Sequence, residues 1–501
     1  MDNKAELKKV FEQAVLNQKK NNLDKANELY SRILKAFPND IATLNNIGNI
    51  YKEQKKYKLA ADYYNKALSI NSDDIITNFN LALLYQLVNR FKEAIELYNK
   101  IIKINPSHIR SYINLMEIYD KTNNEIKLEN IILNYENSLK KRSEISLYKS
   151  RLYLRLKKYQ EVINILEDIN FQDDQIHLEQ LRVFTLGKAY DYLKKSDNAF
   201  KNFSQSNEID FKLKNKKINK NLYLKEIEKR QEYFQNYKPK NKRRLSEKNE
   251  GPFFMVGFPR SGTTLLDTIL RSHSSIEVIE EKPLVERLVR NLDSLSQNNF
   301  NNLEKISGKQ INNIKDIYLK DLNINISKKN DEKILIDKLP LNLIYIGEIL
   351  KVFPNSKFIF SLRHPCDCVL SCFMQNFKMN NAMANFLNIE DSAKLYDSSM
   401  KLWEIYLSNF NPNYIEVKYE DLVENFNKTI LSILKFLKLP WEDSVLRFNK
   451  TAKDRFQINT PSYDQVIQPI YKSATNRWKL YEKQLSRVYP TLEPWIKKFN
   501  Y

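Results

Sequence analysis

The sequence predicts two architectures in one chain of 501 residues: an α-solenoid of helical repeats, followed by an α/β domain with a parallel sheet. A 34-residue interval recurs in the first part, which is typical of stacked helical repeats. In the second part, short apolar runs alternate with helical patterns, as in βα units. We therefore assign residues 1–210 to the solenoid, 211–250 to a basic helical linker and 251–501 to the α/β domain.

Small and aromatic residues at fixed places carry the repeat. The markers 34 residues apart are Ala26, Ala60 and Ala94, then Tyr30, Tyr64 and Tyr98, and then Gly48 and Ala82. A weaker pattern continues through Val162, Leu186, Gly187, Tyr190, Ala199 and Phe203. Small residues let paired helices approach closely, and the rings fill the space beside them, so we interpret all of these residues as core packing. The pattern resembles the tetratricopeptide repeat, which implies a concave face that binds protein segments.

The linker holds half of the formal net charge of +20, because residues 212–248 contain 14 Lys and Arg against 4 Asp and Glu. Its first part has a helical pattern, with Leu222, Ile227 and Phe234 as the expected anchors, and a polar stretch with a proline follows. Since the excess is concentrated here, we interpret it as a solvated segment and predict no nucleic-acid partner.

Five apolar runs in the last part predict buried strands, at 253–257, 276–279, 333–336, 357–362 and 414–417. Helical patterns lie between them, at 341–352, 395–410 and 427–438. This alternation favours a parallel sheet with helices packed on it.

The sharpest motif follows the first of these strands. Gly257 and Gly262 have the spacing of a phosphate-binding loop, whose amides and helix N-terminus would face an anion. Thr263 and Thr264 add hydroxyl donors, and Arg260 supplies a cation inside the loop. Thr263 stands where the loop of a nucleoside triphosphatase has lysine, so the motif favours a single phosphate or sulfate group over a triphosphate.

The segment PRSGTTLL, at 259–266, resembles the 5′-phosphosulfate loop of sulfotransferases that use 3′-phosphoadenosine 5′-phosphosulfate (PAPS). The resemblance implies a P-loop-like sulfotransferase fold and PAPS as co-substrate. The donor-binding residues that it implies in the loop are Arg260, Ser261, Gly262, Thr263 and Thr264. Arg363 and Ser371, which follow the fourth strand, match the pair that holds the 3′-phosphate in this family.

Over residues 252–480 the chain is similar to the tyrosylprotein sulfotransferase branch of that family. By this resemblance Glu281 matches the catalytic base, Lys338 the catalytic lysine and Ser462 the serine that contacts the transition state. Glu281 would accept the acceptor's proton, and Arg260, Lys338 and Ser462 would stabilise the developing charge, with no metal required.

The resemblance also concerns the nucleotide. Tyr419 matches a nucleotide-contacting tyrosine, and Arg477 replaces a lysine on the 3′-phosphate side. Gln375 stands where the animal enzymes have a further PAPS-binding arginine, so affinity for the 3′-phosphate would depend on Arg363 and Arg477. We also expect neither the membrane anchor nor the lumenal cysteines of the animal enzymes in this protein.

Several alternatives stay open at this point. Glu281 could be a solvated acidic residue and Lys338 an exposed lysine at a helix start, with His364 as another candidate base. A P-loop kinase or NTPase would use Asp337 to hold Mg²⁺, but it lacks the loop lysine. The third alternative is a non-catalytic repeat scaffold with a degenerate transferase domain.

The expected partner is a protein or peptide acceptor, favoured as acidic because the chain is basic, which the repeats would present to the active site. A glycan or a small metabolite is the alternative acceptor. We predict no membrane span, because no stretch is long and apolar enough. The cysteines, at 366, 368 and 372, lack the paired spacing of common zinc sites and cannot form a disulfide framework, which favours a cytoplasmic protein without a metal.

Overall fold

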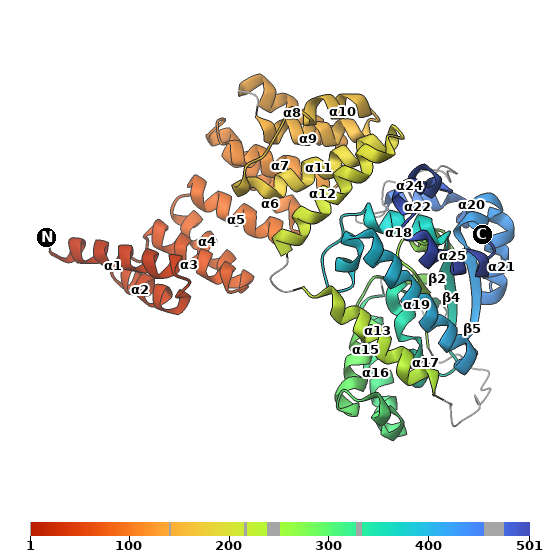
Figure 1. Cartoon of the computed structure of the whole chain (residues 1–501). Helices are drawn as coiled ribbons and strands as arrows, with labels where there is room; N and C mark the ends of the chain where they lie inside the picture. Colours follow the sequence, from red (N-terminus) through yellow and green to blue (C-terminus); the bar gives the residue numbers. More distant parts are fainter. Residues whose placement is uncertain (1, 140–141, 215–217, 238–250, 327–332, 455–474) are drawn as a thin grey trace. The chain divides into compact units, whose positions relative to one another are not determined.

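The computed structural model describes residues 2–139, 142–214, 218–237, 251–326, 333–454 and 475–501 (Figure 1). They form two compact units, Met1–Asp173 and Asp174–Tyr501. The helices of the first unit are α1 (Asp2–Lys19), α2 (Leu23–Ala36), α3 (Ile41–Glu53), α4 (Tyr57–Ile70), α5 (Ile75–Leu87), α6 (Phe91–Ile104), α7 (Ile109–Lys121), α8 (Glu125–Ser138), α9 (Ser143–Arg155) and α10 (Tyr159–Leu166).

Successive helices of the first unit pack in pairs, as the 34-residue pattern predicts. The repeated alanines and tyrosines are fully buried. Gly48 is needed for the close approach of α3 and α4, because a Cβ there would lie 2.5 Å from the Tyr64 ring. The hydroxyl groups of Tyr64 and Tyr98 donate to Asn49 and Gln86 at 2.8 and 2.9 Å, so the buried rings keep their polar atoms satisfied. The interpretation of these residues as core packing is confirmed.

The second unit begins with a helix pair that continues the repeat pattern, α11 (Ile176–Tyr192) and α12 (Ser196–Lys214). Its helices also pack on later parts of the second unit. The Phe200 ring stacks on Phe373 with centroids 4.7 Å apart, and Asn207 donates to the Phe373 carbonyl at 3.0 Å. The compact division therefore lies before this pair, whereas the sequence pattern alone places the end of the solenoid at residue 210.

Helix α13 (Lys220–Gln235) lies in the segment predicted as a linker. The Arg230 guanidinium forms an almost fully buried ion pair with Glu348 at 2.8 Å, and it lies over the Tyr345 ring at 4.6 Å. Ile227 and Phe234 are buried as expected, but Leu222 is 47% exposed, so its prediction as an anchor was wrong. This part of the basic segment is integrated into the core of the second unit.

A five-stranded parallel sheet forms the centre of the second unit, in the order β2-β3-β1-β4-β5. Its strands are β1 (Phe253–Gly257), β2 (Ile276–Glu280), β3 (Ile334–Lys338), β4 (Lys357–Leu362) and β5 (Asn413–Lys418). All five predicted strands are confirmed, within one or two residues at their ends. The chain leaves β1 toward β2 and leaves β4 toward β5, so the carboxyl ends of these neighbours border the crevice where open α/β sheets bind ligands.

Helices cover both faces of the sheet. Within the described residues, the α helices that follow β1 in chain order are α14 (Thr263–Leu270), α15 (Leu284–Ser296), α16 (Gly308–Ile324), α17 (Ile346–Val352), α18 (Pro365–Phe373), α19 (Ile389–Phe410), α20 (Tyr419–Glu424), α21 (Phe426–Leu437), α22 (Phe448–Asp454), α24 (Glu482–Leu485) and α25 (Tyr489–Lys498). Short 3₁₀ helices include η4 (Pro340–Tyr345) and η8 (Arg477–Tyr481). The predicted stretches 341–352, 395–410 and 427–438 lie in η4 with α17, in α19 and in α21.

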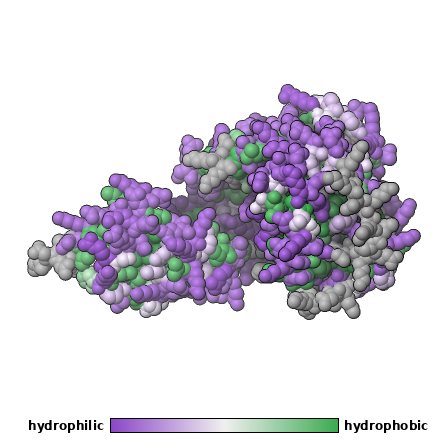
Figure 2. All heavy atoms as spheres, turned by 90° about the horizontal axis from the view of Figure 1, so that it is seen from below, coloured by the Kyte–Doolittle hydropathy of each residue, from purple (hydrophilic) through white to green (hydrophobic). Residues whose placement is uncertain are grey.

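The two faces have separate apolar cores. On one face, Met255 and Ile336 pack with side chains of α14 and α21, such as Leu266 and Ile433. On the other face, aromatic rings from β1 and β4 meet α16 and α19, with the Phe360 and Trp403 centroids 4.5 Å apart. The molecular face in Figure 2 is mostly hydrophilic, with hydrophobic residues in small patches.

Candidate functional site

The predicted site residues lie in a row along the carboxyl edge of the sheet. Glu281 follows β2, Lys338 ends β3, the loop with Arg260 follows β1, and Arg363 follows β4. These four strands are consecutive neighbours in the sheet, so the row spans about 14 Å at ~4.8 Å per strand. Sheet order thus brings together residues that are up to 103 positions apart in the chain.

The loop between β1 and α14 has a backbone that holds a tight turn. Gly262 has a φ of +94°, and a Cβ at this position would lie 2.6 Å from the Tyr419 ring. Arg260 also has a positive φ, of +69°, which is rare for a residue with a side chain and typical of functional turns. Ser361 Oγ donates to the Ser261 carbonyl at 2.9 Å and so ties the loop to β4.

The hydroxyl groups of the loop are buried against this turn. Ser261, Thr263 and Thr264 are all less than 9% exposed. The Ser261 hydroxyl is buried and has no hydrogen-bond partner among the residues that the structure describes. A buried donor without a partner is costly unless a ligand oxygen completes it. The loop therefore fits an anionic group such as phosphate or sulfate.

Two arginines, Arg260 of the loop and Arg363 after β4, lie beside each other. Arg260 Nε donates to Ser371 Oγ at 3.0 Å, and Arg363 Nη1 donates to the Arg260 carbonyl at 3.3 Å. The Arg363 guanidinium lies 4.9 Å from the centre of the Tyr419 ring, and its Nη2 is 3.8 Å from Asp367. The structure thus brings together the two predicted anion-binding motifs and Tyr419.

Lys338 is fully buried and surrounded by carboxylates. Its Nζ lies 3.0 Å from Glu281, 3.4 Å from Glu280 and 3.8 Å from Asp267. Burial disfavours the ammonium, but the three carboxylates outweigh burial and raise the pKa of Lys338. The lysine is therefore a charged donor held at a fixed position, and the alternative of an exposed lysine at a helix start was wrong.

The two adjacent glutamates differ in access to solvent. The Glu281 side chain is 32% exposed, whereas the Glu280 side chain is 8% exposed. Glu281 has a φ of +50°, and its backbone N–H donates to the Lys338 carbonyl at 2.8 Å. A strained turn therefore places the Glu281 carboxylate at the surface of the site, where a substrate hydroxyl could reach it.

The other predicted site residues have different positions. Arg477, at the start of η8, is ion-paired with Asp191 of α11 at 2.5 Å. Ser462 lies outside the described residues. His364 caps α18, since its ring nitrogen accepts from the Cys366 N–H, and burial lowers its pKa to about 4. A ring with that role and so weak a basicity is a poor candidate for a general base.

Asp337 points to the opposite face of the sheet from Lys338. It is fully buried and accepts a hydrogen bond from Tyr318 of α16 at 2.6 Å. Burial raises the pKa of Asp337 to about 7. A carboxylate in this position is not available to hold Mg²⁺ at the loop, so the geometry disfavours the kinase alternative.

Sequence reasoning missed two carboxylates at the site, Asp267 and Asp367. Asp267 lies on α14 and is fully buried beside Lys338, and it also forms an ion pair with Arg271 at 2.7 Å. Asp367 lies one helical turn after Arg363 on α18. Asp267 lies seven positions after Arg260 and Asp367 four positions after Arg363, and nothing else in the sequence pointed to them.

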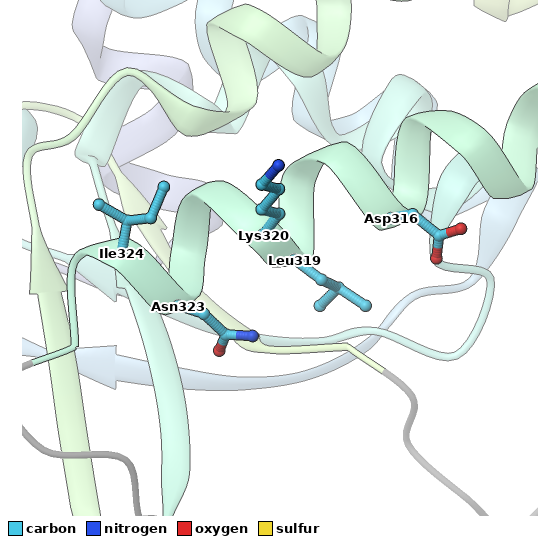
Figure 3. A pocket seen from close by; sticks show the side chains of 5 residues that line it. All are labelled: Asp316, Leu319, Lys320, Asn323 and Ile324. Atoms are coloured by element: carbon cyan, nitrogen blue, oxygen red, sulfur yellow. The ribbon is translucent and has the colours of Figure 1, made fainter.

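Three cysteines and a shallow pocket are not part of the predicted set of site residues. Cys366, Cys368 and Cys372 are buried without disulfides on α18, and no group of metal-ligating side chains occurs in the described part of the chain. A shallow pocket shown in Figure 3 is lined by five side chains of α16 alone and includes none of the predicted site residues. None of the described helices is long and apolar enough to cross a membrane.

Comparison with protein families agrees with the two parts of the chain. Residues 10–40, 41–74 and 77–108 match tetratricopeptide repeats, and residues 252–443 match the sulfotransferase family. The chain carries tetratricopeptide repeats and a sulfotransferase-family domain. The matched range of the sulfotransferase domain includes the anion loop, Glu281, Lys338 and Arg363.

Two relatives of this chain share only 25–28% sequence identity with it. Protein-tyrosine sulfotransferase 1 of Danio rerio is 25% identical over 231 residues, which are 45% of this chain and 64% of that protein. An uncharacterised protein of Aquifex aeolicus is 28% identical over 50% of this chain but only 33% of its own length. The chain thus spans one third to just under two thirds of these relatives. Among solved structures, the sulfotransferase domain of the Synechococcus PCC 7002 olefin synthase is 22% identical, with a TM-score of 0.34, and covers 48% of this chain and 91% of that domain.

Proposed function

We propose that this protein transfers a sulfuryl group from PAPS to a hydroxyl acceptor, with tyrosine of a protein or peptide as the favoured acceptor. The observation that carries the proposal is the Glu281–Lys338 pair beside the anion loop, a base candidate and a buried cation 3.0 Å apart. The sulfotransferase family match and the protein-tyrosine sulfotransferases among the relatives support the donor and the acceptor class.

The residues present fit the donor. The loop 259–264 offers backbone N–H groups and buried hydroxyls for the 5′-phosphosulfate, at the N-terminus of α14. We assign the 3′-phosphate to Arg363 and Ser371, and the Tyr419 ring, 8% exposed and 4.9 Å from the Arg363 guanidinium, would support the nucleotide. The loop proposed for the 5′-phosphosulfate follows β1 and Arg363 follows β4, so the two proposed phosphate sites lie at neighbouring strand ends, and Glu281 lies farther along the edge, beyond Lys338.

The reaction is an in-line displacement at sulfur. The acceptor oxygen forms a bond to sulfur while the bond between sulfur and the 5′-phosphate oxygen breaks, and 3′-phosphoadenosine 5′-phosphate leaves. Glu281 takes the acceptor's proton, because its carboxylate is partly exposed at the site. Lys338 and Arg260 stabilise the negative charge on the transferred group and the leaving oxygen, a role that we also assign to Ser462.

The repeats are proposed to present the acceptor. Tetratricopeptide matches over 10–108 give the chain a surface of a kind that commonly binds peptides, and the net charge of +20 favours an acidic segment. A glycan or a small metabolite is the alternative acceptor. We place the protein in the cytoplasm, where reduced and buried cysteines such as those of α18 are maintained.

A thermal-shift titration tests the donor class. We expect 3′-phosphoadenosine 5′-phosphate to raise the unfolding midpoint of the full chain, and ATP with Mg²⁺ to leave it unchanged, since only a ligand of the native state stabilises it. Stabilisation by ATP–Mg²⁺ alone would favour a kinase or NTPase, and stabilisation by neither ligand would favour a scaffold with a degenerate domain.

A transfer assay then tests the acceptor. Incubation with PAPS labelled in the sulfuryl group should label an acidic peptide that contains tyrosine. The matched control is the same peptide with phenylalanine in place of tyrosine, which has no hydroxyl group. Equal labelling of both peptides, or labelling of a sugar only, would overturn tyrosine as the acceptor.

A further inference from the structure

An ion pair joins α11 to the segment that carries Arg477. Asp191, near the C-terminus of α11, accepts from Arg477 Nε at 3.1 Å and pairs with Arg477 Nη2 at 2.5 Å. The same carboxylate accepts a hydrogen bond from the Tyr481 hydroxyl at 2.7 Å. The Asp191 side chain is 12% exposed and that of Arg477 is 27% exposed, so solvent screens this pair only in part. Both residues belong to the second compact unit.

The segment that begins at Arg477 lies along the face of α18 that carries Asp367 and Ser371. Arg477 Nη2 is 3.2 Å from the Met374 sulfur, and the next N–H, that of Trp478, donates to Asp367 at 2.8 Å. Asp367, Ser371 and Met374 are four and three residues apart and therefore share one helical face. Ser371 is the residue that accepts from Arg260, so η8 runs beside the residues proposed to hold the 3′-phosphate.

The planar guanidinium of Arg477 can adopt few orientations while it is paired with Asp191. A carboxylate that meets both Nε and Nη2 engages one edge of the planar fork. The group can then rotate little, and the remaining edge, with Nη1, is the one that can meet a phosphate. Without the carboxylate, the long arginine side chain would be mobile before the phosphate binds. Its rotamer freedom would then be lost on binding, and this entropy cost would weaken the affinity for the phosphate.

We propose that Asp191 is a positioning residue for donor binding, which orients Arg477 toward the 3′-phosphate. The inference rests on the proposed function and extends it, because it makes a helix of the repeat pattern part of the donor site. Asp191 would touch no atom of the nucleotide, and it would act through Arg477 alone.

Calorimetric titration of the full chain tests the proposal with two nucleotides. 3′-Phosphoadenosine 5′-phosphate carries the 3′-phosphate, and AMP lacks it. We expect Asp191→Asn to weaken the affinity for the first about tenfold, the size of one charge-assisted contact, and to leave the affinity for AMP unchanged. Arg477→Ala should have the same selective effect, and the double variant should lose no more than Arg477→Ala does.

Two control variants separate positioning from general support of the fold. Asp197→Asn removes an exposed contact between α12 and α24, with Lys483 at 3.3 Å, and should change neither affinity. Tyr481→Phe removes the other hydrogen bond to Asp191 and should also leave both affinities unchanged. Circular dichroism verifies that each variant is folded.

The outcomes are distinct. If the unmodified chain does not bind 3′-phosphoadenosine 5′-phosphate, the proposed function itself fails. If it binds, and Asp191→Asn binds both nucleotides normally or loses both equally, the positioning role is wrong while the proposed function stands. Additive losses in the double variant would also overturn it, because they would show that Asp191 acts independently of Arg477.

Discussion

Replacement of Glu281 by glutamine separates the proposed base from its neighbours. The amide keeps the size of the side chain but cannot take a proton from the acceptor. We expect turnover to fall by ~10²–10⁴, which corresponds to about 3–5 kcal/mol of transition-state stabilisation. Affinity for 3′-phosphoadenosine 5′-phosphate should stay within a few-fold, because Glu281 and Arg363 lie at opposite ends of the row of site residues along the sheet edge.

The contacts of Lys338 make this result interpretable. After the change, Lys338 still has Glu280 at 3.4 Å and Asp267 at 3.8 Å, so it stays charged and in place. The lost pair joins a fully buried ammonium to a carboxylate that is 32% exposed, and the two remaining carboxylates keep that ammonium compensated, so the cost of an unpaired buried charge does not arise. The variant should therefore unfold at nearly the midpoint of the parent chain, and its lower turnover would report on chemistry.

Glu280→Gln is the matched control, since it neutralises the adjacent carboxylate at a similar distance from Lys338. We expect its turnover to fall less than tenfold, because the Glu280 side chain is 8% exposed, against 32% for Glu281, and is therefore less accessible to an acceptor hydroxyl. The assay is single-turnover transfer from saturating PAPS. Near-normal transfer by Glu281→Gln, together with loss of transfer in Glu280→Gln, would refute the assignment.

Three further results are expected. Arg363→Ala should weaken binding of 3′-phosphoadenosine 5′-phosphate about tenfold or more in calorimetry, but that of AMP little; equal losses would mean that Arg363 supports only the fold. Burial raises the pKa of Asp337 to about 7, so between pH 4 and 7 the folded state keeps a proton that the unfolded state releases, and the unfolding free energy falls by at most about 4 kcal/mol as the pH rises. Asp337→Asn should remove this fall in urea titrations, and parallel pH curves for the two proteins would contradict the assignment. A fragment of residues 174–501 should bind 3′-phosphoadenosine 5′-phosphate in a thermal-shift assay. A fragment of residues 251–501 should be less stable than 174–501 by about 3–5 kcal/mol, because Glu348 loses its buried partner Arg230; equal stability of the two fragments would disprove this.

Local patterns in the sequence were sufficient for the elements of the fold. The 34-residue interval predicts the helix pairs, because the same small and aromatic residues recur wherever two helices touch. Short apolar runs predict all five strands, since strands buried on both faces are continuously apolar. The anion loop was also predictable, because its glycines and hydroxyls lie within a few consecutive residues.

The composition of the linker was misleading for a physical reason. A run of Lys and Arg is usually solvated, but Arg230 is buried because Glu348, 118 residues away in the chain, neutralises it. Leu222, Ile227 and Phe234 were all predicted as anchors, but Leu222, two positions after the helix start at Lys220, is exposed to solvent. Periodicity therefore indicated a helix here and could not tell what the helix packs on.

The sequence by itself indicated the anion loop, because its glycines and hydroxyls directly follow a predicted strand, and its resemblance to a known family pointed to Glu281 and Lys338. Only the tertiary structure decided that Lys338 is enclosed by Asp267, Glu280 and Glu281, and that Asp191 pairs with Arg477 across 286 positions of the chain. Charge pairing acts through space over a few ångströms, and the order of residues along the chain does not record it until the helices and strands have packed.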